Sequence, residues 1–172
     1  MKVITHTDIV SLDISPRSCY EWAEYMIANK ASALLPAKIS MKPREGVFCN
    51  VMPGIVTLPD GSRYGGVKAV TRYPDRVPSL DSKLMLYDAE SGEFKAIMDA
   101  NWITAMRTGA VAAHSVELFA KRDFRTVGIM GLGNAARAAM LVLADRFRDR
   151  QIPVKLLAYK GQEKLFAARF CG

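Results

Sequence analysis

A glycine-rich turn in the last third of the sequence is the first feature that indicates a specific chemistry. The apolar run at residues 126–130 is followed by GLGNAA at 131–136, and a helical pattern of small and apolar residues continues to Phe147. A strand, a Gly-rich turn and a helix in this order form the dinucleotide-binding fingerprint, here with alanine in the third glycine position. Such turns also occur in α/β proteins without cofactors, but the correct flanking elements favour a cofactor site.

Each small residue of this turn has a physical reason. Gly131 can adopt the backbone angles of a tight turn that a side chain would oppose. Gly133 has no Cβ, so a pyrophosphate can approach the backbone closely. Ala136 is small enough for the helix to lie against the strand, and the new helix offers free N–H groups and the positive end of its dipole to phosphates.

Three basic residues occupy positions where packing does not require a cation. Lys68 lies within an apolar strand pattern, where an ammonium group needs a counter-charge or a water-lined cavity. Arg107 lies near the start of a long helical pattern among small residues, where a guanidinium could bind a carboxylate through two parallel hydrogen bonds. Lys38 opens a predicted strand. A solvent-facing lysine or a surface ion pair is the simpler alternative for each.

Other catalytic patterns are absent from the sequence. No Ser/His/Asp order or Cys/His pair stands out, which argues against hydrolase chemistry. His6 and His114 lie near no metal-like cluster, and for His114 simple packing or exposure is favoured over a general-base role. Cys19, Cys49 and Cys171 are far apart and lack the spacing of metal ligands, so we expect buried or free thiols and no metal site.

The elements that must position these residues follow from periodicity and turn residues. Ser15-Pro16 is a strong helix start, and an apolar stripe extends that helix to about Ser32. A β-rich region follows, with turns at 43, 53–54, 59–61, 73–75 and 90–92, of which 60–61 and 91–92 are typical hairpin tips. The predicted strands cover residues 2–5, 37–41, 46–52, 64–71, 83–88 and 94–98.

A long helix is predicted at about 100–121, capped by Asp99 or Asn101. Its face is rich in Gly and Ala around Gly109, so another element can pack closely against it. The next pattern is a strand at 126–130, a helix at 134–148 and a strand at 154–158, which form one right-handed βαβ unit. A last helix begins near Gln162.

These elements predict an α/β protein of two domains. Residues 1–122 would form a β-rich α+β domain for substrate binding and dimerisation, and residues 123–172 the N-terminal part of a Rossmann-type domain. Because a dinucleotide domain normally has about six parallel strands and only two are predicted, we expect that the second domain is truncated.

Composition limits the other classes of protein. Half of the 172 residues are apolar, which is enough for a folded core, and no apolar run approaches the length of a bilayer span. The first ten residues lack a signal-peptide pattern, so we expect a cytoplasmic protein. The net charge of +7 is spread along the chain without a nucleic-acid-binding module, so it fits anionic small ligands or a merely solvated basic surface.

The residues after the β-rich region also resemble a known family. The stretch MDANWITAMRTGAVAAHSVELFAKRDFRTVGIMGLGNAA at 98–136 resembles the ornithine cyclodeaminase/mu-crystallin family, and so do Val51-Met52-Pro53, Gly66-Val67-Lys68 and Ser91-Gly92. The similarity extends from about Ala37 to Phe170. The joint pattern is far more specific than the Gly-rich turn alone.

The resemblance implies a fold and an activity. In such proteins a β-rich domain binds the substrate and forms a homodimer, and a Rossmann domain binds NAD(H) or NADP(H). The shared chemistry is hydride transfer between nicotinamide and the α-carbon of an amino acid or cyclic imine. The family includes cyclodeaminases, ketimine reductases and alanine dehydrogenases, so the chain resembles an enzyme of amino-acid metabolism with oxidoreductase or lyase activity.

The family's motifs imply roles for particular residues. Lys68 and Arg107 would hold the substrate carboxylate, with Lys38 where the family often has arginine and Met52 beside the substrate. Lys68 would also polarise the reacting centre as the catalytic residue. The cofactor-binding residues would be Ser82, Arg107, Gly131, Gly133, Asn134, Ala135 and Lys160.

Lys160 bears on the choice of cofactor. The second strand of the βαβ unit ends in Leu157-Ala158-Tyr159-Lys160, without an acidic residue to bind a ribose 2′-hydroxyl. A cation suits a 2′-phosphate, so NADP(H) is slightly favoured over NAD(H), although a solvent-facing Lys160 explains the pattern nearly as well.

Two alternatives stay open. The chain could be a non-catalytic, mu-crystallin-like binding or dimerisation protein, or a ketimine reductase or alanine dehydrogenase on the same scaffold. In the family the acidic residue that transfers a proton comes later than position 172, so we expect the present chain alone to be inactive. The sequence decides neither the substrate nor the direction of the reaction.

Overall fold

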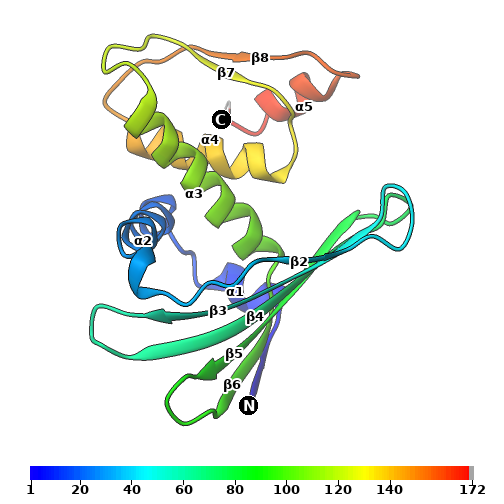
Figure 1. Cartoon of the computed structure of the whole chain (residues 1–172). Coiled ribbons are helices and arrows are strands. Elements are labelled where there is room, and N and C mark those ends of the chain that lie inside the picture. Colours follow the sequence, from blue (N-terminus) through cyan, green and yellow to red (C-terminus); the bar gives the residue numbers. More distant parts are fainter. Residues whose placement is uncertain (171–172) are drawn as a thin grey trace. The chain divides into compact units, whose positions relative to one another are not determined.

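The computed structural model describes residues 1–170, which divide into two compact units (Figure 1). The first unit contains residues 1–13 and 26–104, and the second contains residues 14–25 and the chain from Ala105 onward. The predicted α/β class is confirmed, because one unit is built on a β-sheet and the other on a strand–helix–strand motif. The predicted functional division between residues 122 and 123 stays a prediction.

The first unit is a six-stranded sheet with the order β1-β6-β5-β4-β3-β2 (Figure 1). Successive antiparallel pairing joins β2 to β6, whereas β1 lies parallel to β6 at the opposite edge from β2. The strands are β1 (Lys2–Ile4), β2 (Ile39–Met41), β3 (Phe48–Thr57), β4 (Arg63–Arg72), β5 (Leu80–Asp88) and β6 (Phe94–Asp99).

Both predicted hairpin tips are confirmed. Gly61 joins β3 to β4 with φ +85°, and Gly92 joins β5 to β6 with φ +75°, angles that favour glycine. Asp60 accepts hydrogen bonds from the Ser62 amide and hydroxyl. This local turn chemistry is what made the two tips recognisable in the sequence.

The predicted turn at Pro53-Gly54 is wrong, because β3 continues through both residues to Thr57. Pro53 pairs with Val67 on β4. On the other side of β3, strand β2 pairs only with residues 49–51, so the N–H that proline lacks is not needed for a bond to β2. A Cβ on Gly54 would lie 2.9 Å from a methyl carbon of Leu35. Glycine therefore allows the segment that precedes β2 to approach the strand.

The N-terminal part of the chain differs from prediction in two places. The helix α1 (His6–Ser11) was not predicted; it has a capping box in which Thr5 and Asp8 each bind the other's backbone N–H, and it packs against β6. The next helix, α2 (Pro16–Ala28), ends earlier than predicted, and a 3-10 turn at Lys30–Ser32 follows it.

The second unit contains the βαβ motif that the sequence predicts. The strand β7 (Val127–Ile129) pairs in parallel with β8 (Val154–Leu156), and the helix α4 (Asn134–Arg146) connects them. The long helix α3 (Asn101–Phe119) and the short helix α5 (Gln162–Ala167) complete it, together with the first part of α2.

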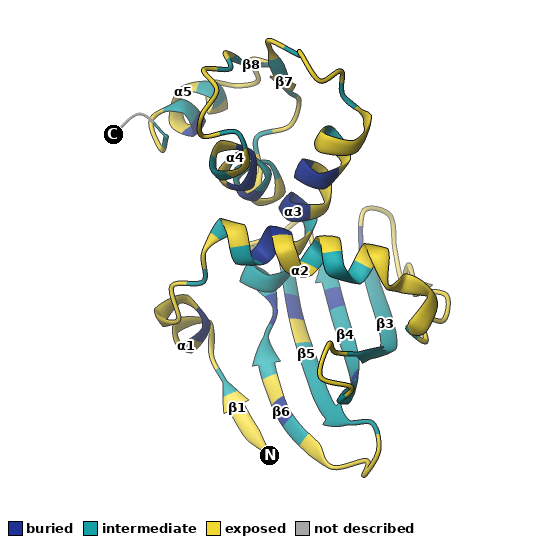
Figure 2. Cartoon of the chain, turned by 90° about the vertical axis from the view of Figure 1, so that its left-hand side faces the viewer, coloured by how far each residue is buried: buried dark blue, intermediate teal, exposed yellow. Residues whose placement is uncertain are grey.

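The predicted close packing at Gly109 is confirmed. A Cβ on Gly109 would lie 2.4 Å from the carbonyl carbon of Ala138, so the backbones of α3 and α4 touch there. Ala110, Ala113 and Val142 are fully buried, and Figure 2 shows the buried residues of α3 and α4 in dark blue. Small side chains thus set the distance between the two helices.

Three further observations concern the described residues only. None of their helices is both long and apolar enough to cross a membrane. Their His, Cys, Asp and Glu side chains form no group of three that could hold a metal ion. Cys19 and Cys49 are free thiols as expected, whereas Cys171 lies outside the described residues.

Candidate functional site

Lys68 lies in the middle of β4, within the first unit. The strand register pairs it with Met52 on β3 and with Leu84 on β5, so the two predicted substrate residues Lys68 and Met52 are neighbours across the sheet. The ammonium nitrogen of Lys68 donates a hydrogen bond to Oγ1 of Thr104 at 3.5 Å, near the long limit for such bonds. Lys68 is half-buried.

Lys38 lies close to Met52 in the strand register, next to the start of β2. It precedes the Ile39–Val51 pair by one position, and one more step of that antiparallel register would face it to Met52. The strand begins at Ile39, however, so Lys38 is an exposed residue just outside β2. Its predicted contact with the substrate stays a prediction.

A partly buried polar network extends from Thr104 within the first unit. Ser82 is only 3% exposed, and its hydroxyl lies 3.1 Å from Oδ1 of Asn101 and 3.2 Å from Oγ1 of Thr104. The backbone N–H of Ser82 donates to the same Asn101 oxygen at 2.9 Å. Because this hydroxyl already has two partners, the predicted contact of Ser82 with a cofactor stays a prediction.

Two carboxylates end the network. Nδ2 of Asn101 donates to Asp81 at 3.0 Å and to Asp99 at 3.2 Å. Hydrogen bonds from Lys83 and Asn101 hold the pKa of Asp81 below its usual value. Burial raises the pKa of Asp99, but donors from Lys83 and the Asn101 backbone outweigh it and lower the pKa overall. His6 lies 3.5 Å from Asp99 as a further partner.

The carboxylates act in turn on Lys83. Its ammonium group lies 2.9 Å from an oxygen of each, and both bonds raise the pKa of Lys83. The carboxylates are therefore ions near neutral pH, and they act only as hydrogen-bond acceptors. Asp99 also accepts the backbone N–H of Asn101 and so caps the start of α3, one of the two caps that the sequence predicts.

Arg107 lies three residues after Thr104 on α3, in the part of that helix that belongs to the second unit. Its side chain is exposed. The structure thus leaves the guanidinium accessible to a ligand, and the predicted carboxylate and cofactor contacts of Arg107 stay predictions.

The Gly-rich turn has the geometry that the fingerprint requires. Gly131 has φ +83°, which a side chain would oppose, and Gly133 caps α4 with extended angles. A Cβ on Gly133 would meet no atom within 4 Å, so the space in front of the helix is open. A cavity of about 530 Å³ adjoins the turn and is lined by Gly131, Gly133, Ala135 and apolar residues of α3 and α4.

These features fit the pyrophosphate of a dinucleotide. No side chain of the described residues caps the first turn of α4, so its N–H groups can donate to phosphate oxygens. The motif residues Asn134 and Ala135 are exposed and form that first turn. The site would hold the group through the backbone, as its glycines predict.

Arg137 is a residue that the sequence reasoning missed. It lies in the first turn of α4, and its Nε is buried without a hydrogen-bond partner among the described residues. A buried donor of this kind is costly unless a ligand or water satisfies it. The signal in the sequence was an arginine directly after the small residues GLGNAA.

Lys160 follows β8 and is exposed. Its backbone has φ +49°, an uncommon angle for a residue with a side chain, and its ammonium group lies 5.2 Å from the centre of the Tyr159 ring. The position after the second strand of the βαβ motif is the one at which a ribose is recognised. Whether Lys160 contacts a ribose phosphate stays a prediction.

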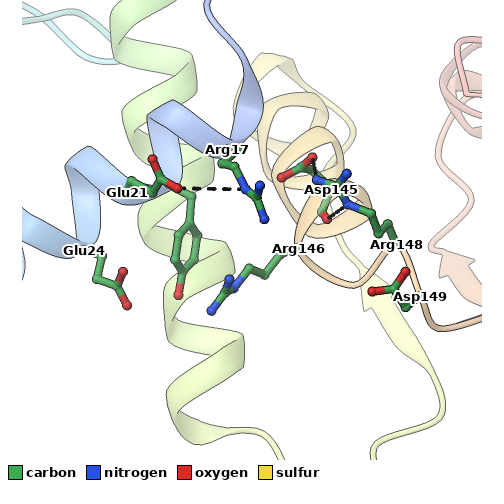
Figure 3. Close-up of a pocket in the computed structure, with 8 residues that line it drawn as sticks. Arg17, Glu21, Glu24, Asp145, Arg146, Arg148 and Asp149 are labelled. Atoms are coloured by element: carbon green, nitrogen blue, oxygen red, sulfur yellow. Dashed lines mark hydrogen bonds and ion pairs between the residues drawn. The ribbon is translucent and has the colours of Figure 1, made fainter.

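A second cavity, of about 290 Å³, lies within the second unit between α2 and the end of α4 (Figure 3). Its charges largely pair with each other: Arg148 lies 2.6 Å from Asp145, and Arg17 lies 3.9 Å from Glu21. On this wall Arg146 pairs with Glu117. The mixed, mutually paired charges indicate a contact between helices more than a binding site.

His114 is buried on α3, next to Tyr20, one of the residues that line this cavity. Its Nδ1 lies 2.9 Å from the hydroxyl of Tyr20, which donates to Glu117 at 2.6 Å. Of the two simple alternatives that the sequence leaves for His114, packing and solvent exposure, the structure shows packing. Burial and the hydrogen bond to Glu117 raise the pKa of Tyr20 to about 12, so the phenol stays protonated in this network.

Comparison with known proteins identifies the family. The sequence profile of the ornithine cyclodeaminase/mu-crystallin family matches residues 2–170, nearly the whole chain. The chain belongs to this family. Among family members, the ketimine reductase mu-crystallin of Mus musculus is 30% identical over 109 residues, which cover 61% of this chain and 34% of the mouse protein.

Solved structures agree with this assignment. The Δ1-pyrroline-2-carboxylate reductase of Thermococcus litoralis, solved with NADH and L-proline, is 27% identical with a TM-score of 0.79 and covers 98% of this chain. The iminosuccinate reductase of Paracoccus denitrificans, solved with NAD⁺, is 21% identical with a TM-score of 0.80, again over 98% of this chain, and shows the fold alone. The present chain covers 53% and 54% of these two proteins.

Proposed function

We propose that this chain forms the substrate-binding part and the first part of the nicotinamide site of an NAD(P)-dependent oxidoreductase, which acts on the α-carbon of an amino acid or cyclic imine. The proposal rests on the presence of two features in the same chain, a lysine bound to a polar network and a Gly-rich turn that opens a helix. Lys68 is held by a buried polar network in the first unit, and the Gly-rich turn of the second unit leaves the start of α4 open.

In this proposal basic residues bind the substrate carboxylate. Arg107 donates two parallel hydrogen bonds, and Lys38 and Lys68 add positive charge. Met52, the neighbour of Lys68 across β3 and β4, contacts the apolar part of the substrate. The Lys68 ammonium group also polarises the nitrogen or carbonyl at the reacting carbon, which makes that carbon a better hydride acceptor.

The cofactor is held mainly by backbone groups. Gly131, Gly133, Asn134 and Ala135 line the pyrophosphate, with Ser82 and Arg107 as further contacts. Lys160 binds a ribose 2′-phosphate, so NADPH is slightly favoured over NADH. When bound, the nicotinamide supplies or accepts the hydride, and the protein's part is to orient it and exclude water.

The related proteins support the coarse class of activity. The mouse relative is named a ketimine reductase, and the Thermococcus protein was solved with a nicotinamide cofactor and an amino acid. We further propose a cytoplasmic homodimer. The chain spans about half the length of the solved relatives. A non-catalytic, mu-crystallin-like binding protein is the alternative to an active enzyme.

A titration of the purified chain tests the cofactor site. NADPH and NADH are added separately, and nicotinamide fluorescence is followed. Saturable binding that is tighter for NADPH supports the proposal, whereas no binding to either cofactor overturns the cofactor part of it. The oligomeric state is measured by light scattering on the same sample.

A second titration tests the carboxylate site with L-proline, the amino acid in the Thermococcus structure. Arg107→Ala is expected to weaken binding at least about tenfold, because a hydrogen-bonded charge is lost. Arg125→Ala is the matched control, an exposed arginine of the same unit outside the proposed site. Equal affinity of the Arg107→Ala variant and the unchanged chain would reject the assignment.

A further inference from the structure

We infer that Thr104 is a positioning residue for Lys68, and that a one-way series of hydrogen bonds from Lys68 to Asp81 and Asp99 keeps the Thr104 oxygen directed at the ammonium group. All of its members lie in the first unit. The inference deepens the proposed function, since its consequence for a substrate rests on that function, but the hydrogen-bond series can be tested without a substrate.

The direction of the series is set at its carboxylate end. Asp81 and Asp99 are ionised acceptors, so the amide group that faces them must be the NH₂ of Asn101. The alternative orientation would place the amide oxygen of Asn101 against two carboxylates. The amide oxygen therefore faces Ser82, where it accepts the backbone N–H at 2.9 Å.

The Ser82 hydroxyl has a single hydrogen, and the Asn101 oxygen is 3.1 Å away. That oxygen cannot donate, so the contact is favourable only when Ser82 donates to it. The hydrogen of Ser82 is thereby used, and its oxygen is left as an acceptor for the Thr104 hydroxyl at 3.2 Å. Because Ser82 is 97% buried, water does not compete freely for either group.

The Thr104 oxygen then acts as the acceptor for Lys68. Its own hydrogen goes to Ser82, so the ammonium group of Lys68 meets an acceptor at 3.5 Å and never the hydroxyl hydrogen. Lys68 and Thr104 each make other interactions as well, so this bond fixes the direction of the ammonium group without being its only partner.

Asp81 and Asp99, the last acceptors of the series, are held in place by ion pairs. Lys83 donates to both carboxylates at 2.9 Å, and His6 lies 3.5 Å from Asp99. This clamp joins β5, β6 and the start of α3, the elements that carry Ser82, Asp99 and Asn101. The position of a reactive lysine on β4 is thus coupled to the start of the helix that also carries Arg107.

The first experiment needs no ligand. The chain is labelled with ¹⁵N-lysine, the ammonium signal of Lys68 is assigned with Lys68→Arg, and hydrogen exchange at that nitrogen is measured by NMR. Thr104→Val removes the acceptor at nearly constant shape and is expected to speed exchange about tenfold, the size of one lost hydrogen bond to a charge. Thr104→Ser keeps the hydroxyl and is expected to restore slow exchange.

A second variant interrupts the series without touching Lys68. Ser82→Ala removes the acceptor of the Thr104 hydrogen, so the Thr104 oxygen is no longer held toward Lys68, and exchange at Lys68 is expected to rise about threefold, less than in Thr104→Val. Ser115→Ala is the control, because the Ser115 hydroxyl is exposed and donates to the Val111 carbonyl of its own helix. Unchanged exchange in both Thr104→Val and Ser82→Ala, or no recovery in Thr104→Ser, overturns the inference.

L-Proline binding separates this inference from the proposed function. If the unchanged chain binds L-proline, Thr104→Val is expected to weaken binding about three- to tenfold and Thr104→Ser to restore it. Equal affinity in Thr104→Val would refute the positioning role. If the unchanged chain does not bind L-proline, the proposed function fails at this site, and the exchange measurements still decide whether the hydrogen-bond series exists.

Discussion

Arg146 donates a hydrogen bond to each carboxylate oxygen of Glu117, from Nε and from Nη2, both at 2.6 Å. The guanidinium also lies over the ring of Tyr20 at 4.7 Å, and the Tyr20 hydroxyl donates to the same carboxylate. The three residues come from α4, α3 and α2, so one ion pair ties together three helices of the second unit.

This ion pair predicts a loss of stability in acid. The hydrogen bonds from Arg146 lower the pKa of Glu117 from 4.5 to about 2. Because the pKa of Glu117 is lower in the folded protein than in the unfolded chain, the ionised carboxylate stabilises the fold at pH values above about 4.5. This stabilisation is lost as the pH falls from about 4.5 to 2. Glu117 is about a third exposed, so solvent screening reduces the expected contribution to about 1–2 kcal/mol.

Thermal unfolding followed by circular dichroism at pH 7 and at pH 3 tests this prediction. Glu117→Gln is expected to lower the midpoint at pH 7 and to flatten its dependence on pH. Glu21→Gln, which removes the exposed 3.9 Å pair with Arg17, is expected to change neither. A Glu117→Gln variant with the pH dependence of the unchanged chain would contradict the assigned pKa.

Gly109→Ala is expected to destabilise the second unit by about 1–3 kcal/mol, the cost of overpacking. The gain in helix propensity, at most about 1 kcal/mol, acts in the opposite direction but is smaller. The clash wins because the new methyl group would lie 2.4 Å from the backbone of α4, which cannot move aside like a flexible side chain.

Gly128→Ala is the control for this substitution, because a Cβ there meets nothing within 4 Å. Urea unfolding of both variants gives the comparison. A Gly109→Ala variant as stable as the unchanged chain would mean that α3 and α4 separate at low cost.

The two glycines of the cofactor turn are expected to respond differently to alanine. Gly131→Ala places a side chain at φ +83° and is expected to lower stability by about 1 kcal/mol. Gly133→Ala has open space and ordinary angles, so the fold stays intact while the methyl group blocks the pyrophosphate. NADPH binding to Gly133→Ala is expected to be at least about tenfold weaker.

Thermal midpoints and fluorescence titrations of the same two variants separate the effects. Undiminished NADPH affinity in Gly133→Ala would place the pyrophosphate elsewhere.

Lys160→Asn tests the cofactor preference. Asparagine tolerates the positive φ of this position better than most residues, so the substitution removes the charge without adding backbone strain. NADPH affinity is expected to fall about three- to tenfold, whereas NADH affinity stays the same, because only NADPH carries the 2′-phosphate. An equal loss for both cofactors, or none for either, argues that Lys160 only faces solvent.

Local signals explain what the sequence could predict. The hairpin tips at Gly61 and Gly92 and the turn at Gly131 depend on the backbone freedom of single residues, and all three have positive φ. The continuation of β3 through Pro53 could not be predicted from local chemistry. Proline is tolerated there because β2 does not pair with β3 at this residue, and that depends on the pairing of distant strands.

The candidate site shows the same limit. Lys68 and Arg107 stand out by residue type, but the partners that hold Lys68 come from β5 and from α3, 14 to 36 residues further along the chain. Ser82, Asn101 and Thr104 are ordinary polar residues until the fold brings them together. A capping box at Thr5 and Asp8 was readable in the sequence, yet a helix as short as α1 gives too little periodicity to predict.

The parallel pairing of β1 with β6 has a consequence for synthesis. Residues 2–4 are synthesised more than ninety residues before their partners at 96–98, and by then the hairpins of β3 to β6 can already have begun to close. The closure of so large a loop is entropically costly until the sheet exists to receive the strand. Strand β1 is therefore expected to join the sheet only after β6 has formed, and until then β6 presents an open edge to which other chains could pair.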